Sequence, residues 1–353
     1  MKEILTRTEC TAMKGIAILG IMLHNYCHWL KGITRENEYT WNQWKNDQLW
    51  TALSLPDELL PMHLVSYFGH YGVPVFLFLS GFGLVMKYER GTTSEVNIWR
   101  FVRYNYLKLF RIFIVGFVLF TMFDAFTPGI HRYQAHEVVA MIGMFANFLE
   151  HPSEVVWPGP YWYFSVTLQL YILYRVLLYR RHWSITVALM VLCWLWQIAY
   201  LDDAVTLERL RYNLVGGMLP FGLGVLAGRF QNTGACASFF QNKSTCLGIL
   251  LLSVVLILVM CLNIQAWLWV PALIVIGTIA LVKLLPESIM TYVVWLGTIS
   301  AAIFVIHPLV RKIFVRPYIQ DDMYAGLLLY VVATLLMSWL VKKIIDHIPS
   351  PKL

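Results

Sequence analysis

Charge and cysteine motifs are what this sequence has least of. Only 13% of its 353 residues are charged, whereas 59% are hydrophobic, and a soluble domain carries about 25% charged residues. This balance excludes an ordinary soluble protein and predicts a polytopic membrane protein. The six cysteines include no Cys-x-x-Cys pair, so the sequence indicates neither a disulfide framework nor a zinc site. Internal repeats and low-complexity segments are also missing, and we expect a single domain over residues 1–353.

The charged residues that are present are mainly basic. Lysine and arginine number 27 against 20 aspartates and glutamates. The basic residues form short clusters between apolar runs, as the positive-inside rule predicts, so we expect a lipid bilayer and not nucleic acid as the partner. Residues 1–11 are too polar for the core of a signal peptide, so we expect the first apolar helix to remain as an anchor.

Ten apolar runs approach the ~20 residues that a spanning helix needs. They are roughly Thr11–Leu30, Val65–Lys87, Leu109–Thr127, Tyr161–Tyr179, Ile185–Leu201, Tyr212–Phe230, Cys246–Asn263, Trp267–Leu284, Thr291–Val310 and Tyr324–Val341. An eleventh run, Val138–Leu149, is short. If it does not span, the basic clusters at 180–181, 229–243 and 342–343 all fall on the side of the N-terminus. The sequence therefore predicts an all-α helix bundle of about ten transmembrane helices with both termini in the cytoplasm.

This topology leaves one exception and two long outer loops. Arg311, Lys312 and Arg316 fall outside, against the positive-inside rule. The loops at about 31–64 and 128–160 are expected on the extracytoplasmic side. Their tryptophans suit either an aromatic belt at the membrane interface or a platform for the apolar face of a sugar ring.

The first apolar helix carries ionisable groups at both ends. Lys14 and His24 lie ~15 Å apart along an ideal helix axis, and such groups are expensive within a membrane, so they usually mark a site. A neutral imidazole accepts a proton from a hydroxyl at physiological pH, which makes His24 a candidate general base. The alternative is a histidine that bonds another helix and only supports packing. His28 lies on nearly the same face and favours a polar cavity.

Lys108 and Arg111 begin the third helix on the predicted cytoplasmic side. They suit either topological anchoring against lipid headgroups or a clamp for the phosphates of a nucleotide-bearing cofactor.

Two further segments place polar residues inside apolar runs. Pro74 would kink the second helix and free a carbonyl group, and the small residues around Ser80 would permit close helix approach. His307 is a second deep histidine near the outer end of the ninth helix, where it could meet His24.

Taken in order, these segments resemble the acyltransferase-3 family of integral membrane acyltransferases. The resemblance covers nearly the whole chain and rests on an ordered set of motifs. They are Lys14-Gly15-Ile16-Ala17 followed by His24, Val73-Pro74-Val75-Phe76-Leu77-Phe78-Leu79-Ser80-Gly81-Phe82, Lys108-x-x-Arg111, Trp162-Tyr163-Phe164-Ser165-Val166 with Gln169 and Tyr171, and Trp295-Leu296-Gly297 to Ser300 with His307-Pro308.

The resemblance implies an enzyme of the bacterial cytoplasmic membrane, an acyl-CoA-dependent O-acyltransferase. It would move an acyl group, most simply acetyl, from cytoplasmic acyl-CoA to a hydroxyl of an extracytoplasmic or lipid-linked carbohydrate, without a metal. The residues that it implies for the donor are Lys14, Lys108, Arg111, Tyr171 and Gln169. Those that it implies for catalysis are His24 as base, with His28, Ser80 and His307. Ser80 would orient the thioester or act as a covalent carrier.

The chain departs from the family pattern at three places. Lys14 stands where the family commonly has arginine, so it can hold phosphate only as a point charge. Nine residues separate it from His24 where the family has ten, which places His24 ~80° off the face of Lys14 and Asn25 at the ideal position. An acidic residue of the fifth segment is replaced by Thr167 and Leu168.

Two other functions fit the same sequence. Buried histidines and proline-broken helices also suit a proton-coupled transporter or exporter of a lipid-linked sugar, although the chain lacks an inverted repeat. The departures from the family pattern also suit a catalytically silent relative that binds acyl-CoA or polysaccharide. The acceptor, the acyl chain and the oligomeric state are left open by the sequence.

Overall fold

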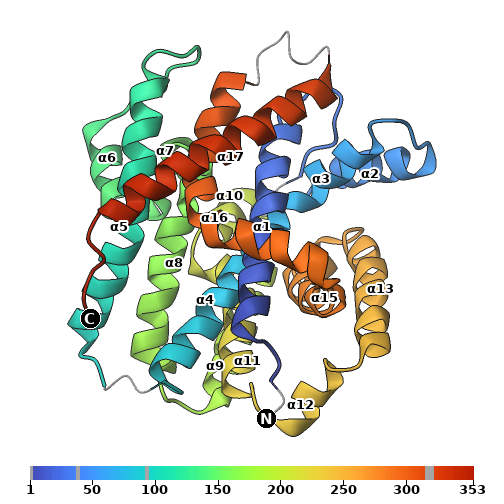
Figure 1. The fold of residues 1–353 in the computed structure, drawn as a ribbon, viewed down its shortest axis with the longest axis vertical. Helices are drawn as coiled ribbons and strands as arrows, with labels where there is room; N and C mark the ends of the chain where they lie inside the picture. The colour runs from blue at the N-terminus through green and yellow to red at the C-terminus, as the bar shows by residue number, and fades with distance from the viewer. Residues whose placement is uncertain (1–2, 37–39, 92–94, 315–321) are drawn as a thin grey trace.

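The computed structural model describes residues 3–36, 40–91, 95–314 and 322–353, apart from the side chains of 234–236. Every regular element in these ranges is helical, which confirms the predicted all-α class. Both termini lie in the lower half of the view in Figure 1.

Several of these helices have the length and composition of membrane spans. The five that are long and apolar enough to cross a bilayer are Leu60–Tyr88 (α3, η1 and α4), Ile98–Asp124 (α5), Lys243–Met260 (α13), Glu287–Phe314 (α16) and Met323–His347 (α17). Three shorter apolar helices are Trp183–Ala199 (α9), Leu214–Arg229 (α11) and Val270–Leu284 (α15). The remaining two predicted runs correspond to α1 (Arg7–Cys27) and to α8 (Trp162–Leu173), which the π-helix η4 (Tyr174–Leu178) continues. Each of the ten apolar runs therefore contains a helix.

The segments between these helices hold short helices, most of which lie outside the ten apolar runs. They are α2 (Gln43–Ser54), α6 (Ala135–Ile142), η2 (Ala146–Phe148), α7 (Pro152–Val155), η3 (Gly159–Tyr161), α10 (Ala204–Arg211), α12 (Gly234–Phe239) and α14 (Ile264–Trp267). The eight residues of α6 span only ~12 Å, so the run at 138–149 does not form a membrane-crossing helix. The first outer loop also ends earlier than predicted, because α3 begins at Leu60.

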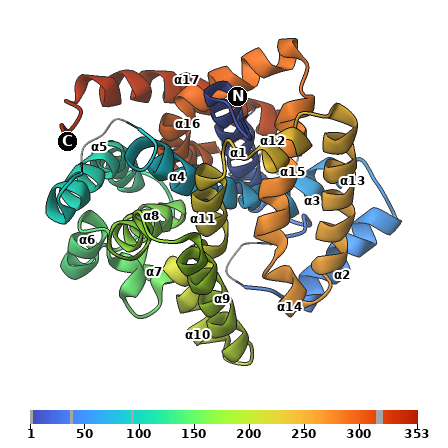
Figure 2. The ribbon, with the colours of Figure 1, turned by 90° about the horizontal axis from the view of Figure 1, so that it is seen from below.

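Helix α1 lies at the centre of the bundle. Figures 1 and 2 both place it between α16, α4 and α15. A capping box begins it, in which the Thr6 hydroxyl accepts from the Glu9 amide at 3.2 Å and the Glu9 carboxylate accepts from the Thr6 amide at 2.7 Å. Glycines set its distance to α16: a Cβ at Gly15 would overlap the Val293 carbonyl. Small residues thus allow these two backbones to approach closely.

The second apolar run bends where proline removes a hydrogen-bond donor. Leu60–Phe68 (α3) and Gly72–Tyr88 (α4) are joined by a 3₁₀ turn, η1, at Gly69–Tyr71. Pro74 has no amide hydrogen to give to the His70 carbonyl four residues earlier; that carbonyl instead accepts from Gly72. In place of the predicted kink the structure has a 3₁₀ turn, and His70 lies in this turn.

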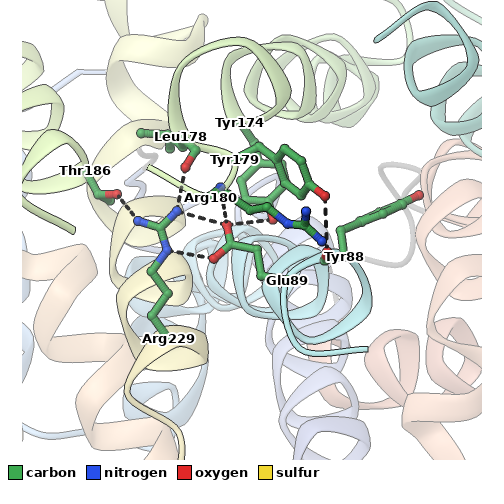
Figure 3. A network of polar contacts seen from close by, with 8 residues as sticks. All are labelled: Tyr88, Glu89, Tyr174, Leu178, Tyr179, Arg180, Thr186 and Arg229. Atoms are coloured by element: carbon green, nitrogen blue, oxygen red, sulfur yellow. Dashed lines mark hydrogen bonds and ion pairs between the residues drawn. The ribbon is translucent and has the colours of Figure 1, made fainter. Parts of the chain in front are cut away.

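A buried ion pair joins α4, η4, α9 and α11 at one end of the bundle (Figure 3). Arg229 donates to both carboxylate oxygens of Glu89 at 3.0 and 2.9 Å, and to the Thr186 hydroxyl at 3.3 Å. Tyr174 donates its hydroxyl to the same carboxylate at 3.0 Å, as does the Arg180 amide at 3.2 Å. One glutamate thereby ties together helices that are distant in sequence.

The cations that violated the positive-inside rule have partners within the protein. Arg311 lies 4.5 Å from the centre of the Trp29 ring and donates to the Asn25 side chain at 3.3 Å. Lys312 forms an ion pair with the fully buried Asp124. Arg316 lies outside the described residues. Because the bundle itself holds Arg311 and Lys312, their positions give little information on which side of the membrane this end of α16 lies.

Candidate functional site

Three cavities follow one another along α1, and we name each by its walls. The lysine cavity, of about 200 Å³, is lined by three ammonium groups together with Ser80, Tyr88, Tyr104, Asn105 and Tyr171 among others. The ammonium groups belong to Lys14, Lys87 and Lys108. Lys87 donates to the Tyr104 hydroxyl at 3.1 Å. The cavity therefore gathers positive charge beside hydroxyl groups, which suits an anion.

The middle cavity, of about 190 Å³, is mainly apolar. The rings of Phe76, Tyr163, Phe164 and Phe304 form much of its wall. They contact one another, with the Tyr163 and Phe304 ring centres 5.3 Å apart and those of Phe164 and Phe304 5.7 Å apart. Such a lining holds few groups that could bind water.

The histidine cavity, of about 380 Å³, has the richest chemistry. Three imidazoles, those of His24, His28 and His70, line it. Its other walls come from α1, α4, α7, η3, α8, α10 and α16 and their ends, and include Asn25, Trp29, Ser153, Trp157, Trp162, Glu208, Tyr212 and Phe304. Trp157, from the outer loop at 128–160, thus meets the deep histidines here, whereas the tryptophans of the loop at 31–64 do not line this cavity.

Shared walls connect the three cavities. Lys14, Phe76 and Ser80 line both the lysine cavity and the middle cavity. Ile21, Val73 and Phe304 line both the middle cavity and the histidine cavity. The row of cavities therefore runs beside α1 from Lys14 to His24, in spite of the one-residue change in their spacing.

His24 is held in one tautomer. Its Nδ1 lies 2.7 Å from the Ser66 carbonyl oxygen, and since a carbonyl only accepts, Nδ1 carries the hydrogen. In the neutral ring this leaves Nε2 with its lone pair free. His24 is buried, and its ring centre lies 5.0 Å from that of His28 and 5.3 Å from that of His70. A histidine oriented in this way can accept a proton from a hydroxyl group.

Close backbone contact brings His70 to His24. A Cβ added at Gly69 would lie 2.5 Å from the Gly20 carbonyl oxygen and 2.7 Å from the His24 Cβ. Only glycine fits there, so the 3₁₀ turn rests directly on α1. His70 is 3% exposed, and neither of its ring nitrogens has a hydrogen-bond partner among the described residues.

The structure separates the other predicted residues into two groups. Ser80, Tyr171, Lys14 and Lys108 share the lysine cavity, and His28 joins His24. Three residues line none of the three cavities: Arg111, Gln169 and His307.

Each residue of that second group has an intramolecular partner. Arg111 donates to the Ser350 hydroxyl near the C-terminus. Gln169 donates to the Asn213 side chain at 2.8 Å and accepts from the Leu214 amide at 2.9 Å, which fastens α8 to the start of α11. His307 Nδ1 lies 3.0 Å from the Ile303 carbonyl of its own helix, in a fully buried position.

Glu208 adds a carboxyl group to the histidine cavity from α10, outside the apolar helices. Burial raises the pKa of this carboxyl above its usual value, and nearby Glu154 adds to the effect, while His151 and Ser153 oppose it. A half-buried carboxyl beside tryptophan rings is a combination that can bond sugar hydroxyls.

His70, Lys87 and Glu208 were not assigned to the site from the sequence. An imidazole inside an apolar run is the signal that singled out His24, and the same signal at His70 would have found it. Lys87 was read only as a topological charge. Nothing in the sequence singled out Glu208, because it lies between two apolar runs and not within one. In the described part of the chain, no group of three or more His, Cys, Asp or Glu side chains is placed to hold a metal ion.

The described residues form an all-helical protein, several of whose helices are long and apolar enough to cross a membrane. The family model described as an acyltransferase domain, that of acyltransferase 3, matches residues 9–343. The chain belongs to the acyltransferase 3 family, and so to the transferases. Comparison with curated proteins and with solved structures found no match.

Proposed function

We propose that the protein moves an acyl group, acetyl in the simplest case, from cytoplasmic acyl-CoA to a hydroxyl of an extracytoplasmic or lipid-linked carbohydrate. The observation that carries the proposal is the row of cavities along α1, with lysines at one end and histidines at the other. This row supports a donor that enters at one face and an acceptor that enters at the opposite face.

The proposed topology is ten spanning helices with both termini in the cytoplasm of a bacterial cell. The lysine cavity would then open on the cytoplasmic side, where acyl-CoA is found. Arg311 donates to the Asn25 side chain and Lys312 forms an ion pair with Asp124, so both of these exceptions to the positive-inside rule have partners within the protein.

Lys14, Lys87 and Lys108 would hold the phosphates of the donor. An ammonium group binds phosphate as a point charge and does not form the paired bonds of a guanidinium. Three lysines around one cavity compensate for the arginine that the family commonly has at position 14. Arg111, which contacts Ser350, lies outside this cavity.

His24 would act as the general base. Its Nε2 takes the proton of the acceptor hydroxyl, the hydroxyl oxygen attacks the thioester carbon, and the proton passes to the departing thiolate. The Ser66 carbonyl keeps the ring in the tautomer that this step needs. The aromatic wall of the middle cavity excludes water and so limits wasteful hydrolysis.

The acceptor would bind in the histidine cavity. Trp157, Trp162 and Glu208 offer ring faces and a carboxyl group, which match the apolar faces and the hydroxyl groups of a sugar.

Binding of labelled acetyl-CoA to the detergent-purified protein tests the proposal. We expect saturable binding that Lys14→Ala weakens by about tenfold or more, equivalent to about 1.4 kcal/mol. Lys342→Ala, at a lysine of α17 that lines none of the three cavities and whose side chain is 37% exposed, is the matched control and should bind normally. Competition between unlabelled succinyl-CoA and labelled acetyl-CoA shows which of the two acyl groups the protein prefers. Failure to bind any short acyl-CoA would contradict the proposal and favour the transporter.

A further inference from the structure

His70 is a buried residue of the histidine cavity, and both of its ring nitrogens are left without a hydrogen-bond partner among the described residues. They lack such a partner although His70 is only 3% exposed. Leaving a buried donor unsatisfied lowers the stability of the folded protein. A protein keeps such a group where something else completes the bond.

The position of His70 indicates what completes it. The ring lines the histidine cavity next to His24, the proposed base, with the two ring centres 5.3 Å apart. Val73, one turn further along, lines both this cavity and the middle cavity. His70 therefore lies where the middle cavity, which would deliver the thioester, meets the cavity that would hold the hydroxyl.

We propose that His70 donates a hydrogen bond to the carbonyl oxygen of the acyl thioester and stabilises the negative charge that forms there during transfer. The inference rests on the proposed function. In the step, the hydroxyl oxygen forms a bond to the carbonyl carbon while its proton moves to His24 Nε2. The carbonyl oxygen gains negative charge, the carbon–sulfur bond then breaks, and the thiolate takes the proton.

The local backbone fixes this donor in advance. Gly69 rests against Gly20, and the 3₁₀ turn that carries His70 continues directly into α4 at Gly72. A donor held in place before the reaction costs no reorganisation when charge develops, and removing one such donor typically slows catalysis by about 10²–10³-fold.

Hydrolysis of acetyl-CoA tests the assignment, because water replaces the unidentified acceptor. The full-length protein is purified as wild type, His70→Phe, His70→Gln and His136→Gln. Phe fills the space of the imidazole without a donor, whereas Gln restores an N–H group. His136 is exposed on α6 and serves as the matched control. The readouts are kcat and KM for hydrolysis, acetyl-CoA binding and the melting temperature.

We expect His70→Phe to lower kcat by about 10²–10³-fold, with KM, acetyl-CoA binding and melting temperature unchanged. His70→Gln should recover part of the loss, and His136→Gln should match wild type. Unchanged hydrolysis in His70→Phe would overturn the inference and assign His70 to acceptor binding or packing. A loss of hydrolysis that is accompanied by an equal loss of acetyl-CoA binding, or by a lower melting temperature, would also overturn the inference.

The controls separate this inference from the proposed function. If wild type neither binds nor cleaves acetyl-CoA, the proposed function fails and the role of His70 fails with it. If wild type is active and His70→Phe is equally active, only the role of His70 is wrong.

Discussion

At the scale of single residues, the orientation of His24 separates it from its neighbour His28. His24 donates from Nδ1 to the Ser66 carbonyl, whereas His28 Nδ1 is buried without a partner in the described part of the chain. A base must present a free lone pair in a fixed direction. His24 meets this condition, and His28 shares its cavity without the fixed tautomer.

Alanine substitution at these two histidines distinguishes their roles. We predict that His24→Ala lowers kcat for acetyl-CoA hydrolysis by about 10²–10⁴-fold, the usual contribution of a general base. His28→Ala should cause a smaller loss. The measurement is single-turnover cleavage of labelled acetyl-CoA at saturating donor. Intact cleavage in His24→Ala with abolished cleavage in His28→Ala would reverse the assignment.

Four charged or ionisable residues that the sequence singled out lie together in the structure, and their roles stay predictions. Lys14, His24, His28 and Lys108 all line the row of cavities. The sequence could not locate partners such as Ser66, because a backbone carbonyl 42 positions away leaves no trace in side-chain chemistry. His307 was matched to His24 by depth alone, and depth does not determine which face of a helix a side chain occupies.

At the scale of elements, glycine contacts set the geometry of the site. Gly69 holds η1 against α1, and Gly81 and Gly224 do the same between α4 and α11, where a Cβ would overlap a carbonyl of the facing helix. The sequence predicted close helix approach from the small residues around Ser80. It did not predict the 3₁₀ turn, because a proline indicates a kink without specifying how the backbone adjusts.

Gly69→Ala tests whether this contact positions the histidines. We predict a loss of stability of about 1–3 kcal/mol, as for an overpacked core, together with a lower kcat, because α1 and η1 must separate. Gly248→Ala on α13 is the matched control, since a Cβ there meets nothing within 4 Å. Thermal unfolding and acetyl-CoA hydrolysis are measured together. A stable and fully active Gly69→Ala protein would contradict this account of the contact.

At the C-terminal end of α4, the Glu89–Arg229 ion pair joins this helix to α11, as the Gly69 contact joins η1 to α1 at the other end. Its side chains are 12% and 11% exposed, and breaking a buried pair by removing one partner costs ~3–5 kcal/mol. We predict a loss of that size for Glu89→Gln, measured by thermal unfolding in detergent.

An exposed ion pair provides the control for Glu89→Gln. Lys342 and Asp346, 37% and 53% exposed, form an i,i+4 pair on α17, and Lys342→Ala should cost at most ~1 kcal/mol. Equal melting temperatures for the Glu89 and Lys342 variants would show that the network contributes little.

At the scale of the whole molecule, hydropathy predicted where the helices lie, while the sidedness that charge predicted stays a prediction. All ten apolar runs contain helices, and the run at 138–149 holds only the short α6. The helices α2, α7 and α10 escaped prediction because they are short and lie outside the ten apolar runs. Two of them, α7 and α10, supply Ser153 and Glu208 to the histidine cavity, so this part of the site could not be assembled from the sequence.

The central claim is that the donor enters at the lysine end and reacts at the histidine end, across the membrane. Acetyl-CoA does not cross a sealed bilayer, so vesicles containing the protein can offer it to one face only. The protein is reconstituted, the orientation of its termini is determined by protease access to a C-terminal tag, and labelled acetyl-CoA is added outside. We predict that thioester cleavage rises in proportion to the fraction of molecules whose termini face outward. Cleavage that is independent of orientation, or confined to molecules with inward-facing termini, would contradict the claim.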